Sequence, residues 1–252
     1  MYTIQEKTAQ ISILTLGDCV VSSGGRTVAP TFNFLRILVY ILIETRGRPV
    51  LRRRIASLIW SDTPSDQANA DIRQTIARIR RFQEEENFQL LSTDSQTAWL
   101  NLDQNVYIDL AEFIDLIANP SPSAWVRLCQ IYKGDLLGSQ RPAGEGFEEW
   151  LDHHRTALRY DFVSAISQAV LPDSQLTPQE RHFCAQRLLQ EDPYHEGAHR
   201  ALMYDAALNG QFSFVRYLFE ECSRTLRDEL GIKPAEETTR LYRRLINGEP
   251  VS

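Results

Sequence analysis

The stretch QANADIRQTIARIRRF, residues 67–82, decides how the N-terminal half of this chain is interpreted. Its apolar residues recur at the spacing of one face of a helix, which we expect to run from about Gln67 to Glu84. This apolar stripe consists of Ala68, Ile72, Ile76 and Ile79. The 3.6-residue period turns the opposite face outward, and that face carries Gln67, Ala70, Gln74, Ala77, Arg78 and Arg81. Because arginine and glutamine can each read a base through two hydrogen bonds, this face is typical of a helix that reads DNA.

The segments on either side of this helix predict a small DNA-binding fold. Residues 11–28 alternate apolar side chains around a Ser-Ser-Gly-Gly turn, which predicts short strands. Helical periodicity follows over Phe32–Thr45 and again over Leu51–Trp60. The runs FQLLS (88–92) and AWLNL (98–102), joined by TDSQT, predict a second hairpin. A sheet, three helices and a hairpin in this order predict a winged helix-turn-helix, whose third helix docks in the major groove and whose hairpin is the wing.

Basic charge is concentrated around the predicted third helix. The formal net charge of the chain is −6, yet residues 32–82 hold an excess of +6, so the remainder carries −12. The arginines of this segment are Arg36, Arg46, Arg48, Arg52, Arg53, Arg54, Arg73, Arg78, Arg80 and Arg81. Arginine favours forked contacts to phosphates and base edges, which indicates an anionic partner for this segment. A solvated basic face without a ligand is the alternative.

Beyond Tyr107-Ile108-Asp109 the chain becomes acidic and helical. Thr177-Pro178 with Glu180 predicts a capping box, Asp192-Pro193 predicts another helix start, and Gly231 a helix end. Helices paired near the ~34-residue period favour a tetratricopeptide-like stack, which binds proteins or small ligands, although a scaffold role is the alternative. The predicted fold class is mainly α with small β-sheets: a winged helix-turn-helix domain over residues 1–105 and an α-helical tetratricopeptide-like domain over residues 106–252.

Composition and motifs argue against a membrane protein, a disulfide-rich protein and an enzyme. Of the 252 residues, 43% are hydrophobic and 24% are charged, which is typical of a globular chain. No apolar run approaches the ~20 residues that a bilayer requires, and the N-terminus has no signal-peptide pattern, so we expect a cytoplasmic protein. The four cysteines are scattered, and P-loop, G-x-S-x-G and G-x-G-x-x-G motifs are absent, so we expect no disulfide, catalytic residue or cofactor.

Two parts of the chain resemble known bacterial regulators. The sequences LVYILIETRGRPVLRRRIASLIW (38–60) and QANADIRQTIARIRRF (67–82) are similar to the DNA-binding domain of OmpR-type winged-helix regulators. YKGDLLG (132–138), FEEWLDHHRTALR (147–159) and the stretch from Leu188 to Pro234 resemble the bacterial transcriptional activator domain. From Ile11 to Leu245 the chain therefore resembles regulators of the antibiotic regulatory protein (SARP) type, most specifically in RGRPV, ARIRR and DELGIKP.

The resemblance implies a DNA-binding transcriptional activator that binds direct repeats near promoters and recruits RNA polymerase. Its partners would be double-stranded DNA, RNA polymerase and, on DNA, a second copy of the chain; no membrane is implied. Base-facing positions fall on Gln74, Thr75 and Arg78, and Arg80 and Arg81 fall toward the DNA backbone, with Arg73 also on that flank. The loop expected to contact polymerase comprises Ser61, Asp62, Thr63, Pro64, Ser65, Asp66 and Gln67.

The sequence departs from this pattern in three places. Leu51 and Ala235 stand where helix N-caps usually carry a polar side chain, and the wing turn STDSQT holds one aspartate and no cation. The wing without a cation and the acidic second domain motivate an alternative function, that of a protein-interaction adaptor whose winged helix has lost DNA binding. The retained arginines near the third helix, with Arg36 on the first, weigh against that alternative.

The sequence H-E-x-x-H, formed by His195, Glu196 and His199, raises a third hypothesis. On a helix this spacing places two imidazoles on one face, where they can ligate Zn²⁺ in a metallopeptidase. Asp192-Pro193 predicts that His195 lies in the first helical turn, which Gly197 would loosen. The resembling family has a structural helix in this segment, so His195 and Glu196 are interpreted as incidental surface substitutions, and no metal site is expected.

Overall fold

The computed structural model describes residues 9–30, 32–102, 105–138 and 143–248, and the chain divides into two compact units. Unit 1 comprises residues 1–115 and 131–158, and unit 2 comprises residues 116–130 and 159–252. Unit 1 thus extends past the predicted domain boundary at residue 105, and the division into two functional domains at that position stays a prediction. In the described part of the chain, no helix combines the length and the apolar composition needed to cross a membrane.

Unit 1 opens with a four-stranded sheet of order β3-β2-β1-β7. β1 (Ile11–Leu14) pairs antiparallel with β2 (Val20–Ser23), and β2 pairs in the same way with β3 (Arg26–Val28). The β2–β3 turn uses Gly24 and Gly25 at φ of 53° and 81°, which glycine adopts at little cost. The predicted strands and turn are confirmed. The fourth strand, β7 (Val106–Ile108), pairs parallel with β1 and was not predicted.

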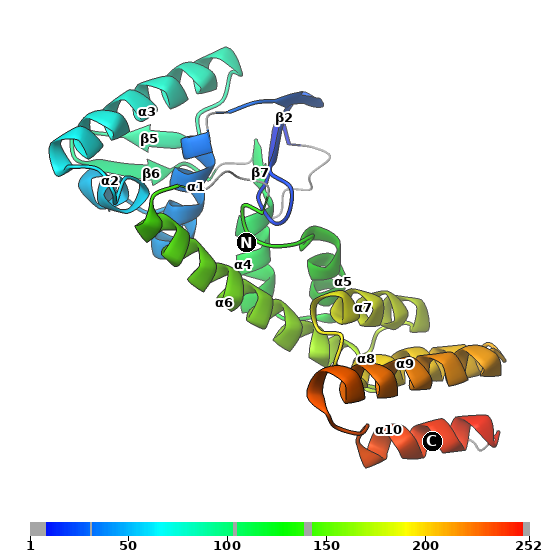
Figure 1. Cartoon of the computed structure of the whole chain (residues 1–252). Coiled ribbons are helices and arrows are strands. Elements are labelled where there is room, and N and C mark those ends of the chain that lie inside the picture. The colour runs from blue at the N-terminus through cyan, green and yellow to red at the C-terminus, as the bar shows by residue number, and fades with distance from the viewer. Residues whose placement is uncertain (1–8, 31, 103–104, 139–142, 249–252) are drawn as a thin grey trace. The chain divides into compact units, whose positions relative to one another are not determined.

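Three helices and a wing follow in the predicted order (Figure 1). These helices are α1 (Phe32–Thr45), α2 (Arg52–Ile59) and α3 (Ser65–Glu85), and they contact one another. The second sheet has the order β4-β6-β5, made of β4 (Val50–Leu51), β6 (Thr97–Leu100) and β5 (Leu91–Thr93). Figure 1 shows α3 running alongside β5 and β6. Leu51 is the N-cap of α2 and makes no side-chain cap hydrogen bond, as its apolar side chain predicts.

Asp109 joins the end of β1 to the start of α4 (Asp109–Ala118). Its carboxylate accepts hydrogen bonds from the backbone N–H of Thr15 at 2.8 and 2.9 Å, of Leu16 at 2.9 Å and of Leu110 at 2.7 Å. The Thr15 hydroxyl donates a further bond at 2.8 Å. Asp109 is only 1% exposed, and burial is the main cause that raises its pKa from 3.8 to about 6. One buried carboxylate thus satisfies three backbone groups from two distant segments.

The first part of α6 (Glu145–Ala169) packs on the helices of the winged helix within unit 1. The Arg36 guanidinium lies over the Phe147 ring at 5.8 Å, and the Trp150 ring lies 5.5 Å from that of Tyr40. Trp150 Nε1 donates to Glu44 Oε1 at 3.0 Å. Because Arg36 is only 8% exposed, it serves this packing and adds little to the arginines that weigh against the adaptor alternative.

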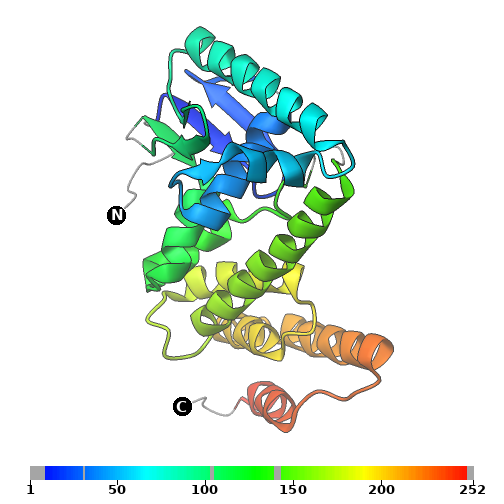
Figure 2. The same ribbon diagram turned by 90° about the vertical axis from the view of Figure 1, so that its left-hand side faces the viewer.

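Unit 2 contains the helical hairpins of the C-terminal region, drawn from yellow to red in Figure 2. Its helices after α5 (Pro122–Ile131) and α6 are α7 (Pro178–Glu191), α8 (Glu196–Leu208), α9 (Phe212–Leu230) and α10 (Glu236–Ile246). α8 packs against α7, α9 and α10. The capping box of Thr177 and Glu180 and the helix end at Gly231 are confirmed, and Ala235 makes no side-chain cap bond. This stack agrees with the predicted helical fold class.

Candidate nucleic-acid interface

α3 is held in place by its apolar stripe and by one buried amide. The predicted stripe residues Ala68, Ile72, Ile76 and Ile79 are all buried. Gln83, also buried, accepts from the backbone N–H of Leu90 at 3.1 Å and of Leu91 at 2.7 Å. Its Nε2 donates to the Leu91 carbonyl at 3.1 Å. These bonds fix the C-terminal part of α3 to β5, so the helix and the wing form one rigid surface.

The opposite face of α3 is exposed and carries polar and basic side chains. The exposed residues of this face include Gln67, Arg73, Gln74, Ala77, Arg78 and Arg81, while Ala70 is half-buried. The predicted orientation of the helix is therefore confirmed, and contact with DNA stays a prediction. Gln74 and Arg78 lie one turn apart, with only the small Ala77 between them, which leaves room for base edges to approach.

Thr75 does not belong to this exposed face. It is only 6% exposed and lies beside the stripe residues Ile72 and Ile76 on the protein side of the helix. Its assignment as a base-facing residue, taken from the family resemblance, is not supported by its position. The physical reason is the helical period, which places residue 75 within 100° of residue 76 and next to residues 72 and 79.

Arg80 and Arg81 make different contacts although they are neighbours. Arg80 Nη2 donates to the Thr93 hydroxyl in β5 at 2.7 Å, so this guanidinium ties α3 to the wing. Arg81 pairs with Glu85 at 2.9 Å, and these side chains are 81% and 59% exposed. Such an exposed pair contributes little to stability and exchanges readily with other anions. Arg81 is therefore better placed than Arg80 for a DNA phosphate.

The wing turn is organised by its aspartate. Asp94 Oδ1 accepts from the backbone N–H of Gln96 at 2.8 Å and of Thr97 at 2.6 Å, and Oδ2 accepts from the Thr97 hydroxyl at 2.9 Å. The backbone bonds, from Thr97 first, lower the pKa of Asp94. Arg52 Nη1 donates to the Asp94 carbonyl at 3.0 Å. The turn has no cation in its own sequence, but Arg52 from α2 and Arg80 from α3 bring guanidinium groups to it.

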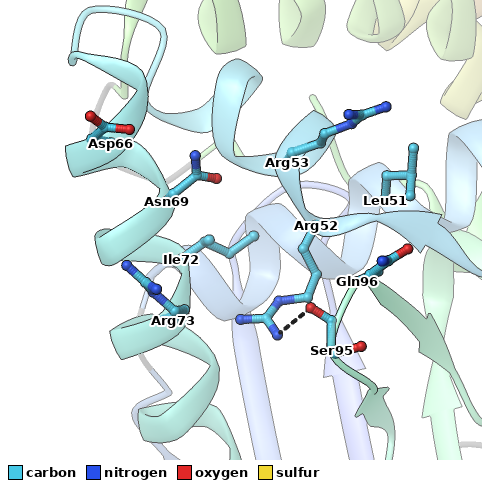
Figure 3. A pocket seen from close by; sticks show the side chains of 9 residues that line it. All are labelled: Leu51, Arg52, Arg53, Asp66, Asn69, Ile72, Arg73, Ser95 and Gln96. Carbon is cyan, nitrogen blue, oxygen red and sulfur yellow. Dashed lines mark hydrogen bonds between the residues drawn. The ribbon is translucent and has the colours of Figure 1, made fainter.

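An open groove of about 740 Å³ lies between the start of α2, the first turns of α3 and the wing. Figure 3 shows its lining residues, with Arg52 reaching toward Ser95 and Arg73 rising from α3. The remaining lining residues are Leu51, Arg53, Asp66, Asn69, Ile72 and Gln96. The lining contains three arginines and one aspartate, so this groove is basic. A protein surface that binds along a phosphate backbone needs such a charge.

Sequence reasoning did not single out Arg52, Arg53, Asn69 and Gln96 as interface residues. In the sequence, the run of three arginines at 52–54 indicates only a local excess of positive charge. Its place at the start of a helix facing the wing depends on the pairing of β4 with β6. The backbone N–H of Arg52 donates to the Gln96 carbonyl at 2.8 Å, which brings these two segments together. A basic run at a helix N-terminus was the available signal.

The predicted polymerase-contact loop is shorter than expected and partly engaged. Ser65, Asp66 and Gln67 form the first turn of α3, because Pro64 serves as its N-cap position. Ser61 Oγ accepts from the Gly146 N–H at 3.0 Å, and Asp62 accepts from the Glu145 N–H at 3.2 Å, so both cap the start of α6. A Cβ atom at Gly144 would lie 2.7 Å from Ser61 Oγ, so a larger residue there would displace this hydroxyl. Thr63 and Pro64 complete the loop.

The H-E-x-x-H residues hold together the helices of unit 2. His195 is the N-cap of α8, where its Nδ1 accepts from the Ala198 N–H at 3.1 Å while Nε2 contacts Ser167 Oγ at 2.9 Å. Glu196 accepts from the Ala235 N–H at 2.9 and 3.1 Å, and His199 is only 4% exposed. The interpretation of His195 and Glu196 as incidental surface substitutions is therefore wrong. α8 begins at Glu196, after His195, because the ring occupies the capping position.

Burial is the first cause that lowers the pKa of both His195 and His199, so both rings favour the neutral form. In the described part of the chain, no three histidine, cysteine or carboxylate side chains gather in a way that could hold a metal ion. Glu196, the residue that a zinc peptidase would use to activate water, is engaged as a helix cap.

We expect purified protein to contain no stoichiometric zinc, and its melting temperature to be unchanged by a chelator. The reason is that all three residues of the motif already have structural partners within unit 2. Elemental analysis and thermal unfolding with and without EDTA measure this. One zinc per chain, lost in His199→Asn, would contradict the expectation.

Comparisons with known proteins agree with this fold. Residues 128–246 match the family model of the bacterial transcriptional activator domain. The chain is therefore similar to this domain over residues 128–246. The matched segment includes α6 to α10, and therefore both the capped start of α6 and the H-E-x-x-H segment. The description of this family refers to transcriptional activation.

A solved structure of Mycobacterium tuberculosis EmbR, in complex with a low affinity phosphopeptide, resembles the fold of the whole chain. The TM-score is 0.65 at 20% sequence identity, over 96% of this chain. The chain spans 66% of the length of that protein. A search of curated proteins gave no significant match. The family match thus confirms the resemblance predicted for the C-terminal part of the chain, and the similarity to this structure confirms the predicted fold.

Proposed function

We propose that this protein is a sequence-specific DNA-binding transcriptional activator that acts in the cytoplasm. It reads base edges with Gln74 and Arg78, follows the phosphate backbone with the basic groove of Arg52, Arg53 and Arg73, and binds direct repeats near promoters, where two copies can sit side by side. The observation that carries the proposal is the exposed polar face of α3 next to that groove. The activator domain supports a role in transcription.

Recruitment of RNA polymerase is the second part of the proposal. The residues available for it are Thr63 to Gln67, since Ser61 and Asp62 cap α6. Pro64, Ser65, Asp66 and Gln67 are all exposed and carry one negative charge. We therefore narrow the polymerase contact from the seven-residue loop to this shorter segment.

Selection of bound duplexes from a random library tests the proposed function. An enriched direct repeat is expected, because two copies on one face of the duplex require half-sites about one or more helical turns apart. No enrichment above the starting library at low salt would overturn the proposal. The adaptor alternative, in which the winged helix has lost DNA binding, would then be the better one, and it is favoured by the acidic wing turn.

The arginines of this groove should contribute equally to the affinity for all DNA sequences. We expect Arg53→Gln and Arg73→Gln to weaken binding to preferred and random duplexes equally, because they lie where phosphates would pass. Each lost phosphate contact should make the dependence of log affinity on log salt shallower by about 0.9. Fluorescence anisotropy at several salt concentrations measures this. Arg216→Gln, on an exposed position of α9, is the matched control and should leave the slope unchanged; equal slopes in all variants would contradict the assignment.

A further inference from the structure

A cavity of about 520 Å³ lies within unit 2, lined by the residues that follow α6 and by α7, α8 and α10. Its volume is in the range of small-molecule sites, and its walls are largely apolar, as such sites usually are. Leu171 and Leu208 belong to these walls and are 41% and 61% exposed, so an apolar ligand would remove their surface from water. Leu241 of α10 closes another side.

The charged residues that line this cavity are all positive. Arg181 of α7 and Arg200 of α8 both line it, together with the phenol-bearing Tyr204, and none of the described lining residues is a carboxylate. The chain outside residues 32–82 carries −12, so a doubly positive cavity stands out against its surroundings. Two guanidinium groups beside apolar walls suit a ligand with an anionic head and an apolar body.

Arg181 has an unused donor. Its Nη2 donates to the Leu176 carbonyl at 3.4 Å, but its Nε–H is buried and has no hydrogen-bond partner among the described residues. A buried N–H without an acceptor is costly, and a nearby anion would lower that cost by its charge. The charge of the lining is the observation that points to an anion, and the unsatisfied donor of Arg181 agrees with it.

Arg200 is oriented by its neighbours. Its Nη1 donates to the hydroxyl of Thr238 at 2.9 Å, and Thr238 is fully buried. Its Nη2 lies 3.7 Å from Glu237 Oε2, whose side chain is 77% exposed. This exposed carboxylate shows that Nη2 can receive an anion, and the pair is weak enough for a ligand to replace it.

We propose that this cavity binds a small amphiphilic carboxylate, with Arg181 and Arg200 contacting the carboxylate and the leucine walls covering an aliphatic body. Such a ligand contacts α7, α8 and α10 at once, so its binding would stabilise the packing of unit 2. This inference concerns the activator domain alone and does not depend on DNA binding by the winged helix.

The test uses the full-length protein with octanoate as the probe, and octan-1-ol and octylamine as the uncharged and cationic probes of the same length. Isothermal titration calorimetry and thermal unfolding measure binding. We expect octanoate to bind at least about ten-fold more tightly than octan-1-ol and to raise Tm, and octylamine not to bind. Equal affinity for octanoate and octan-1-ol, or no binding of octanoate, would overturn the proposal.

Two variants and one control locate the site. Arg181→Met and Arg200→Met should each weaken octanoate binding about ten-fold or more, and Arg216→Met, on the exposed side of α9, should not change it. Since Arg200→Met also removes the bond to Thr238, circular dichroism must show that it is folded; otherwise Arg181→Met decides. Unchanged affinity in folded Arg181→Met contradicts the proposal, and so does inorganic phosphate that competes fully with octanoate, because that would indicate a general anion site.

Discussion

Replacing Arg78 by alanine should weaken binding to the preferred DNA site by about 1–3 kcal/mol, which is roughly 5- to 160-fold in affinity, and should flatten discrimination between sites. Arg78 is exposed on α3, one turn from Gln74, and its guanidinium can donate two hydrogen bonds to the edge of a guanine. Gln74→Ala should have a similar effect at the base that Gln74 contacts. Affinity for random duplexes should change less, because the specific base contacts do not form on such duplexes.

Arg81→Ala is the control that separates base reading from backbone contact. The Arg81 side chain can exchange its exposed ion pair with Glu85 for a contact to a DNA phosphate. We therefore expect Arg81→Ala to weaken binding to preferred and random duplexes by the same factor. Titration of all three variants against both duplexes in one series measures the difference. If Arg78→Ala keeps the full site preference of the wild type, α3 is not the reader, and the adaptor alternative gains support.

The parts of the fold that sequence predicted well are those governed by local periodicity and capping. The stripe from Ala68 to Ile79 fixed which side of α3 is buried, and the same rule, applied strictly, excludes Thr75. The capping box at Thr177 was also predictable from sequence, because Thr, Pro and Glu at these positions are typical of the start of a helix. Family resemblance placed Thr75 on the base-facing side, and there the periodicity was the better guide.

What sequence did not predict depends on contacts between distant segments. Nothing near Arg52 indicates that its backbone pairs with Gln96, or that Ser61 and Asp62 cap a helix more than eighty positions further along the chain. His195 and Glu196 match a zinc motif in their spacing, but the structure gives them capping roles at α8 and α10. Tertiary packing determines which residues these side chains contact, so the sequence alone does not identify their partners.

Asp109→Ala should cause the largest loss of stability among single substitutions in unit 1. The change leaves the buried backbone N–H groups of Thr15 and Leu16, and the first N–H of α4, without an acceptor. At about 1–3 kcal/mol for each unsatisfied group, and with the usual lack of additivity, we expect the free energy of unfolding to fall by about 3–5 kcal/mol. Urea unfolding followed by circular dichroism measures this. The exposed Asp18, in the turn that follows β1, is the matched control, and Asp18→Ala should cost less than about 0.5 kcal/mol.

The pH dependence of the same pair of proteins tests the role of burial. Because burial raises the pKa of Asp109 to about 6 from 3.8, the folded wild type binds a proton in this range that the unfolded chain has released. Its stability should therefore fall as pH rises from about 4 to about 6, and this fall should be absent in Asp109→Ala. The difference in unfolding free energy between the two proteins should thus be larger at pH 4 than at pH 7. A difference that grows with pH would mean that the five hydrogen bonds to the carboxylate outweigh its desolvation, and that Asp109 holds β1 and α4 together as a stable anion.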